Sequence, residues 1–172
     1  MGNDLYGDDG VGIHAVRVLK KELAARRSRL ESRNEADFKE CALSGIALLE
    51  VVGGYDALVI IDTIAKARPV TGRIRVLEAS DMRDVPGPSP HYVSIPQILD
   101  IGRQLGLRVP GQLRVVAVEA KDIYHLGEGL SEKMTSALPR IVERAKKVLR
   151  DLEIQADRER IRPEAPRRSP LL

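Results

Sequence analysis

Several residue types are scarce in this chain, and each scarcity excludes a class of protein or site. Aromatic residues make up 3% of the 172 residues and tryptophan is absent, which argues against base-stacking platforms for single-stranded nucleic acid. Cys41 is the only cysteine, so the sequence offers neither an intramolecular disulfide nor a cysteine-rich zinc site. No apolar run approaches the roughly 20 residues that a membrane span needs, and no signal peptide is visible. We therefore expect a cytoplasmic protein with no membrane partner.

The remaining composition is that of a globular protein. The chain is 43% hydrophobic and 31% charged, and its length suits one domain. The net charge of +3 arises largely from the C-terminal end, so we expect no nucleic-acid partner. We predict a single domain over residues 1–155. Residues 156–172 carry many charges and two prolines around Glu164, cannot bury a core, and are predicted to form a disordered tail.

Hydrophobic periodicity predicts alternating helices and strands. Helical spacing covers residues 10–25, 46–52 and 95–105 and a long final helix capped by Ser131, and strand patterns cover 38–43, 57–61, 73–77 and 113–118. The arginines within 73–77 favour an outer or antiparallel strand. This alternation predicts an α/β fold with three layers, in which helices cover both faces of a mostly parallel sheet.

The segment 2–12, Gly-Asn-Asp-Leu-Tyr-Gly-Asp-Asp-Gly-Val-Gly, combines glycines, an amide and carboxylates just before the first helix. Carboxylates repel phosphate, so the loop is better suited to a cation or to acid–base chemistry than to anion binding. A loop of this type normally follows a buried strand, yet only Met1 precedes it. We therefore expect the true start to lie upstream and the first strand to be missing.

Three polar groups are predicted at the carboxyl edge of the sheet, where ligands of α/β proteins bind. They are Asp8 or Asp9 in the first loop, Asp62 directly after its strand, and His91 in a loop before a helix. Two carboxylates and one imidazole suit a divalent first-row metal with open coordination positions. Each also has a structural interpretation: one of the two adjacent aspartates caps the first helix, Asp62 caps a turn, or His91 bonds to backbone.

Other candidates are weaker. His14 is predicted at a solvated helix position, His125 lacks a spacing partner, and Glu119 either lines the cleft or pairs with a nearby Arg or Lys. The first loop lacks calcium-loop spacing and a Walker lysine, and no serine elbow is present. Cys41 lies in an apolar context, which leaves nucleophilic catalysis without a good candidate.

Taken together, the motifs resemble the hydrogenase maturation endopeptidases. The resemblance begins with the segment 2–12 and continues in order through Ser44-Gly45 with Leu48-Leu49-Glu50, Leu58 to Asp62, Ser89-Pro90-His91, Gly129-Leu130-Ser131 and Ala137-Leu138-Pro139. It covers nearly the whole chain to about residue 152. The chain departs from the family pattern by lacking the strand before Gly2.

The resemblance implies an aspartyl-type endopeptidase with a phosphorylase/hydrolase-like fold. Members remove a C-terminal extension from the large-subunit precursor of nickel–iron hydrogenases after nickel insertion. The resemblance assigns Asp9, Asp62 and His91 as catalytic and nickel-contacting residues, and it implies that the substrate carries the nickel. The chain is expected to be a monomer or weak oligomer. Two other functions stay open: a chaperone that recognises the metal without cleaving, and a peptidyl-tRNA hydrolase-like enzyme, against which the Asp8-Asp9 pair argues.

Overall fold

The computed structural model describes residues 1–27, 36–82, 94–121, 123–124, 126–127 and 129–161. In chain order its elements are η1 (Gly7–Gly10), α1 (Val11–Arg27), η2 (Gly45–Ala47), α2 (Leu48–Val52), β1 (Ala57–Ile64), β2 (Ile74–Glu78), η3 (Ala79–Asp81), α3 (Ile95–Gln104), β3 (Gln112–Glu119) and α4 (Glu132–Ile161), where η marks a single 3-10 turn. The predicted helices and three of the four predicted strands are present.

The described strands form a mixed sheet in the order β1-β3-β2. β1 pairs with β3 in parallel and β2 pairs with β3 antiparallel, so the prediction of a mostly parallel sheet is wrong for these strands. The antiparallel direction of β2, by contrast, matches the prediction. Residues 65–73 connect β1 to β2, and this connection is shorter than the dozen or more residues that a parallel crossover requires.

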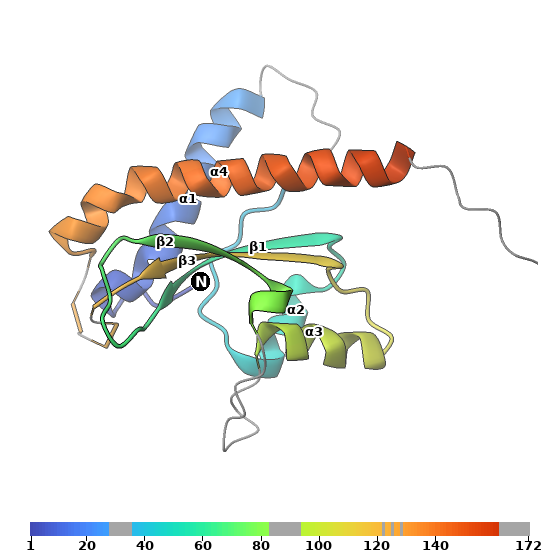
Figure 1. Cartoon of the computed structure of the whole chain (residues 1–172), viewed down its shortest axis with the longest axis horizontal. Helices are drawn as coiled ribbons and strands as arrows, with labels where there is room; N and C mark the ends of the chain where they lie inside the picture. The colour runs from blue at the N-terminus through green and yellow to red at the C-terminus, as the bar shows by residue number, and fades with distance from the viewer. Residues whose placement is uncertain (28–35, 83–93, 122, 125, 128, 162–172) are drawn as a thin grey trace, which may run out of the picture.

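Helices cover both faces of the described sheet, so these elements are arranged in three layers (Figure 1). Successive residues of a strand point to opposite faces. In β3, Val116 and Val118 join the apolar cluster of α1 and α4, whereas Val115 and Ala117 join the cluster of α2 and α3. Each cluster is thus a separate core on one side of the same sheet.

The long final helix begins as the sequence predicts. The Oγ of Ser131 accepts a hydrogen bond from the backbone N–H of Met134 (3.3 Å), the expected geometry of an N-cap. α4 continues to Ile161, beyond the predicted domain end at residue 155, and residues 162–172 lie outside the described part of the chain. None of the described helices is both long and apolar enough to cross a bilayer.

The strand predicted over residues 38–43 is wrong, because this segment has no regular secondary structure. Its apolar residues, Phe38 and the run from Cys41 to Leu43, are compatible with a strand, but a strand is stabilised by the ladder of a neighbouring strand. Within the described part of the chain, no strand pairs with it. The segment instead runs from the level of α1 to the level of α2, past the side of β1 (Figure 1).

Candidate active site

Asp9 lies in η1, the turn that leads directly into α1. The loop that carries it is held by backbone hydrogen bonds, because the N–H of Gly7 donates to the carbonyl of Gly127 (2.9 Å) and the N–H of Gly127 donates to that of Leu5 (3.1 Å). The N–H of Asp9 itself donates to the carbonyl of Tyr6 (3.0 Å). These bonds fix the backbone on which the Asp9 carboxylate is placed.

Two glycines of the loop cannot be replaced without moving backbone. Gly12 lies where α1 approaches the sheet, and a Cβ there would be 2.2 Å from the carbonyl oxygen of Ile61. Gly2 has a φ of 129°, and a Cβ there would be 1.9 Å from the carbonyl oxygen of Asp9. Glycine is therefore required at both positions to bring the Asp9 turn against β1.

Both carboxylate oxygens of Asp9 accept hydrogen bonds. The backbone N–H of Asn3 donates to Oδ2 (2.9 Å), and the hydroxyl of Thr63 donates to Oδ1 (2.7 Å). Because one bond comes from the loop and the other from β1, the side chain is held between the two. This orientation leaves further lone pairs on the oxygens for a ligand.

Asp62 lies within β1, next to Thr63, rather than after the end of the strand as the sequence suggested. The ladder continues beyond it, since Asp62 is opposite Ala117 and Ile64 is opposite Glu119. Its Oδ1 accepts a hydrogen bond from the backbone N–H of Thr63 (3.0 Å). Thr63 therefore contacts both aspartates, Asp9 through its hydroxyl and Asp62 through its N–H. The structure thus brings two of the three predicted site residues together.

The electrostatics of Asp62 differ from those of an exposed aspartate. Burial raises the pKa of its carboxyl above the ordinary value, and the nearby negative charge of Asp9 acts in the same direction. The positive charge at the amine of Met1 and the hydrogen bond from Thr63 lower the pKa, but by less. A raised pKa brings a carboxyl closer to the range in which it exchanges a proton near neutral pH.

Asp8 has a different role from its neighbour. It is 8% exposed, and it accepts hydrogen bonds from the backbone N–H (2.8 Å) and the hydroxyl (3.0 Å) of Ser131. Asp8 therefore connects η1 to the start of α4 instead of capping the first helix. Sequence reasoning missed this contact, because no local pattern indicates a partner so distant along the chain.

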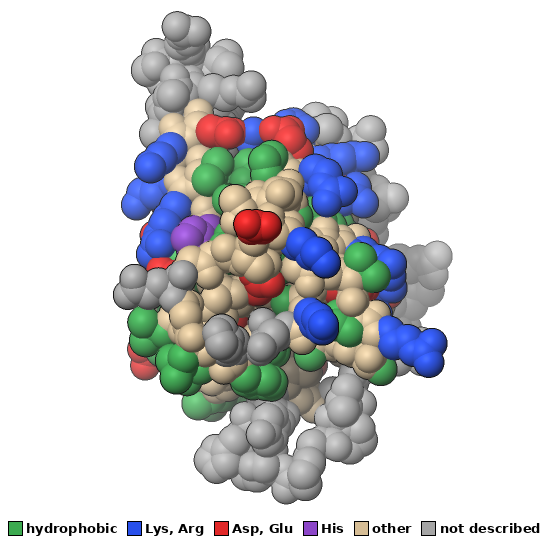
Figure 2. All heavy atoms as spheres, turned by 90° about the vertical axis from the view of Figure 1, so that its left-hand side faces the viewer, with side chains coloured by type: hydrophobic (Ala, Val, Ile, Leu, Met, Phe, Trp, Pro, Cys, Tyr) green, Lys and Arg blue, Asp and Glu red, His purple; other side chains and the backbone are tan. Residues whose placement is uncertain are grey.

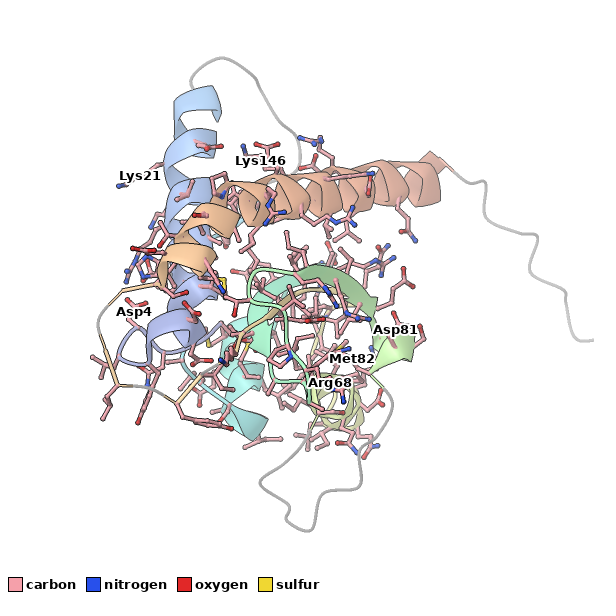
Figure 3. The ribbon with its side chains drawn as sticks, turned by 60° about the vertical axis from the view of Figure 1, so that its left-hand side comes forward. Asp4, Lys21, Arg68, Asp81, Met82 and Lys146 are labelled. Atoms are coloured by element: carbon pink, nitrogen blue, oxygen red, sulfur yellow. The ribbon has the colours of Figure 1, made fainter. Side chains whose placement is uncertain are left out.

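The remaining candidates fall into two groups. His91 and His125 lie outside the described residues. His14 is half-buried, with its Nε2 3.9 Å from Oδ1 of Asp4, and Asp4 is also paired with Arg17 (2.7 Å) beside the start of α1 (Figure 3). This arrangement is an ion-pair cluster adjoining the loop, separate from the Asp9–Asp62 pair.

Glu119 is fully buried at the end of β3 and pairs with arginines, one of the two outcomes that the sequence allowed. Its Oε2 accepts a hydrogen bond from the N–H of Val70 (2.9 Å), and its Oε1 accepts one from Nε of Arg75 (3.2 Å). The hydrogen bond from Val70 and the positive charges of Arg73 and Arg75 lower the pKa of Glu119, whereas its burial raises it. Glu119 is thus a structural ion-pair residue.

Figure 2 shows the side of the molecule toward which β1 and β3 end. Acidic side chains lie near the centre of this face, with Lys and Arg side chains around them. Within the described part of the chain, no three His, Cys, Asp or Glu side chains come together as a metal site. The described portion of the candidate site therefore consists of two carboxylates and a threonine that hydrogen-bonds to each, a set that favours acid–base chemistry or partial coordination of a metal brought by a ligand.

Comparison with known proteins shows the same fold in several peptidases. No protein-family profile and no curated protein sequence matches the chain. Among solved structures, it resembles an endopeptidase from Escherichia coli (TM-score 0.64, 21% identity, 88% of this chain and 89% of that one). It also resembles the hydrogenase maturating endopeptidase HybD from E. coli (TM-score 0.62, 22% identity, 87% and 88%) and the NiFe hydrogenase maturation protease HybD from Thermococcus kodakarensis (TM-score 0.56, 22% identity, 86% and 93%). The chain therefore shares the fold of hydrogenase maturation endopeptidases along most of its length.

Proposed function

We propose that this protein is an endopeptidase that removes the C-terminal extension of a nickel–iron hydrogenase large-subunit precursor. In this proposal the precursor already carries its nickel, which Asp9, Asp62 and His91 contact. The observation that supports the proposal is that Thr63 hydrogen-bonds to both Asp9 and Asp62, within a fold that is shared with hydrogenase maturation proteases. The role of His91 is proposed from the sequence alone.

The two carboxylates suit different parts of the reaction. Asp9 is oriented by two hydrogen bonds and is suited to contact the substrate's metal. Asp62, whose pKa is raised, is suited to accept a proton from water as the water oxygen attacks the scissile carbonyl carbon. The C–N bond then breaks and the proton passes to the leaving amine. A general base in this position contributes about 10²–10⁴-fold to the rate.

The proposal is tested by mixing the protein with nickel-loaded and nickel-free precursor and measuring the precursor mass before and after incubation. We expect loss of the C-terminal extension from the nickel-loaded precursor alone. Equal cleavage of both forms contradicts recognition through nickel. Binding of the loaded precursor with no mass change instead supports the non-cleaving chaperone. Salt-sensitive binding of tRNA, with neither effect on the precursor, supports the peptidyl-tRNA hydrolase-like alternative.

The adjacent aspartates give a matched pair of variants for the same assay. Asp9→Asn removes the charge of a proposed nickel contact, so we expect cleavage to fall by at least about 10²-fold while the fold is retained. Asp8→Asn alters the contact with Ser131 on the other side of the turn, so its effect is expected on thermal stability, with most of the cleavage preserved. The opposite pattern would place the chemistry at Asp8 and overturn the assignment of Asp9.

A further inference from the structure

The connection from β1 to β2 and the start of β2 are basic. Residues 65–75 contain no acidic residue, and their four cations are Lys66, Arg68, Arg73 and Arg75. All four are exposed. The connection crosses the carboxyl end of β3, because the N–H of Gly72 donates to the carbonyl of Glu119 (2.9 Å) and the N–H of Glu119 donates to that of Arg73 (2.9 Å). We call the four cations the basic ledge.

The buried carboxylate of Glu119 holds part of the basic ledge in place. Its Oε1 accepts a hydrogen bond from Nε of Arg75 (3.2 Å), and its Oε2 lies 3.9 Å from Nη1 of Arg73. Glu119 is 0% exposed, whereas the side chains of Arg73 and Arg75 are 51% and 46% exposed. One carboxylate thus orients two guanidinium groups and offsets one of the four positive charges. A guanidinium has five N–H donors, so the bond from Nε leaves donors of Arg75 for a partner.

Arg75 lies on the same face of the sheet as Asp62. In the register of the ladders, Asp62 of β1, Ala117 of β3 and Arg75 of β2 form one row. Ala117 belongs to the core beneath α2 and α3, and residues opposite one another in a ladder point to the same face. Since neighbouring strands lie about 4.8 Å apart, the backbones at Asp62 and Arg75 are separated by about 10 Å. An extended polypeptide covers this distance in about three residues.

The charges on this face favour an acidic polypeptide over a nucleic acid as the partner. Figure 2 shows acidic side chains near the centre of the face, with Lys and Arg side chains around them. A nucleic acid is charged at every nucleotide, so Asp9 and Asp62 would repel its backbone as it crossed the site. A polypeptide can instead present an acidic side chain to the basic ledge and an uncharged peptide bond to the two aspartates. Arginine pairs with a carboxylate through two parallel N–H···O bonds.

We propose that the basic ledge binds an acidic side chain of the polypeptide substrate, about three residues from the peptide bond that lies at Asp62. This inference rests on the proposed peptidase function and adds to it the chemistry of the substrate segment. Arg75 pairs with the substrate carboxylate, while Lys66 and Arg68 attract the acidic segment toward the site. The attraction weakens as salt is added, because exposed charges are screened over about 8 Å at 0.15 M ionic strength.

Matched double variants separate the basic ledge from the overall charge of the protein. Lys66→Gln with Arg68→Gln removes two exposed charges of the basic ledge. Lys20→Gln with Lys21→Gln removes the same charge from exposed positions of α1. In Figure 3, Lys21 lies above the sheet on α1, whereas Arg68 lies below it, toward α3. Thermal melts confirm that each variant is folded.

Binding is measured first, without cleavage, by following backbone amide NMR signals during titration with a capped peptide of alternating Glu and Gly. We expect the Glu peptide to shift signals within residues 65–75 in the unsubstituted protein and in the α1 control, and much less in the ledge variant. The same peptide with Gln in place of Glu should cause no such shift. Equal shifts with both peptides, or none, overturn the proposal. Tighter binding of an RNA of equal charge to the same residues also overturns it, because the partner would then be a nucleic acid.

Cleavage of the nickel-loaded precursor then tests the role of the basic ledge at the site. We expect the ledge variant to raise KM by about three- to tenfold with kcat little changed, because only substrate binding is lost. Arg75→Lys, which keeps the charge but loses the paired donors, should also raise KM. Equal KM values for the unsubstituted protein and these two variants overturn the proposal and leave the peptidase function intact. Absence of cleavage by every protein, with the Glu peptide still bound at residues 65–75, contradicts the peptidase function and leaves the binding of acidic segments supported.

Discussion

At the scale of single residues, Thr63 is the contact that joins the two aspartates. Its hydroxyl is 2.7 Å from Oδ1 of Asp9, and its backbone N–H is 3.0 Å from Oδ1 of Asp62. Only the first of these contacts depends on the side chain. Substitution at this position can therefore alter the orientation of Asp9 while leaving the hydrogen bond to Asp62 in place, which makes Thr63 a positioning residue.

We predict that Thr63→Val lowers cleavage of the nickel-loaded precursor by about ten- to a hundredfold, because a hydrogen bond to a charged group contributes about 1.5–3 kcal/mol. Valine suits a strand, so the unfolding midpoint should change little. Thr63→Ser, which keeps the hydroxyl, should retain most of the activity. Steady-state cleavage rates and thermal melts of the three proteins provide the measurement. Equal loss in the Ser and Val variants would show that the methyl group, rather than the hydroxyl, is what matters.

Asp8 and Asp9 show how far residue-level prediction reaches. The sequence predicted Asp9 and Asp62 at one edge of the sheet, and in the structure Thr63 hydrogen-bonds to both. It could not indicate that Asp8 binds Ser131, because that contact depends on where the loop after β3 returns to the first turn. It also passed over Thr63, although a hydroxyl adjacent to Asp62 at the sheet edge was a usable signal.

At the scale of elements, helices were predicted more reliably than strands. Ser94 and Gln97 form a capping box at the start of α3, and Ser131 caps α4, so local sequence determines where these helices begin. Strands depend on neighbours that can be distant in the chain. Residues 38–43 have a strand-like pattern but no ladder, whereas β1 extends three residues beyond the predicted end at Ile61 because β3 continues alongside it.

Glu119, the last residue of β3, is expected to make the stability of the protein depend on pH. It is a fully buried carboxyl whose pKa is lowered by the hydrogen bond from Val70 and by Arg75 and Arg73. A lowered pKa means that the unfolded chain binds the proton more tightly than the folded protein does. The stability contributed by ionised Glu119 is therefore present above the ordinary glutamate pKa of about 4.3 and is lost as the pH falls below it.

We predict that Glu119→Gln lowers the unfolding midpoint at pH 7, because an amide cannot offer acceptors to both Val70 and Arg75 at once. The difference from the unsubstituted protein should narrow as the pH falls from 6 toward 3, where the glutamate loses its charge. Urea titrations at several pH values measure it. Glu78→Gln, at an exposed position that pairs with Arg114, serves as the control and should show a much smaller effect. If the stability difference between Glu119→Gln and the unsubstituted protein does not change with pH, the assignment of Glu119 as an ionised carboxylate is contradicted.

At the scale of the whole molecule, the sheet separates two apolar cores. One core lies beneath α1 and α4 and includes Ile141, and the other lies beneath α2 and α3 and includes Leu99. Both side chains are buried, with 0% and 3% of their surface exposed. β3 contributes residues to both cores. We therefore expect that a loss of packing on one face of the sheet also destabilises the other face, because the two cores share this strand.

We predict that Leu99→Ala and Ile141→Ala each lower the free energy of unfolding by about 2–5 kcal/mol and that each shifts one single transition. Because the two sites lie on opposite faces and share no side-chain contacts in either cluster, the double variant should equal the sum of the single variants within about 0.5 kcal/mol. Urea unfolding followed by circular dichroism and by hydrogen exchange on both faces provides the measurement. Two separable transitions, one for each core, would show that the sheet does not couple the layers.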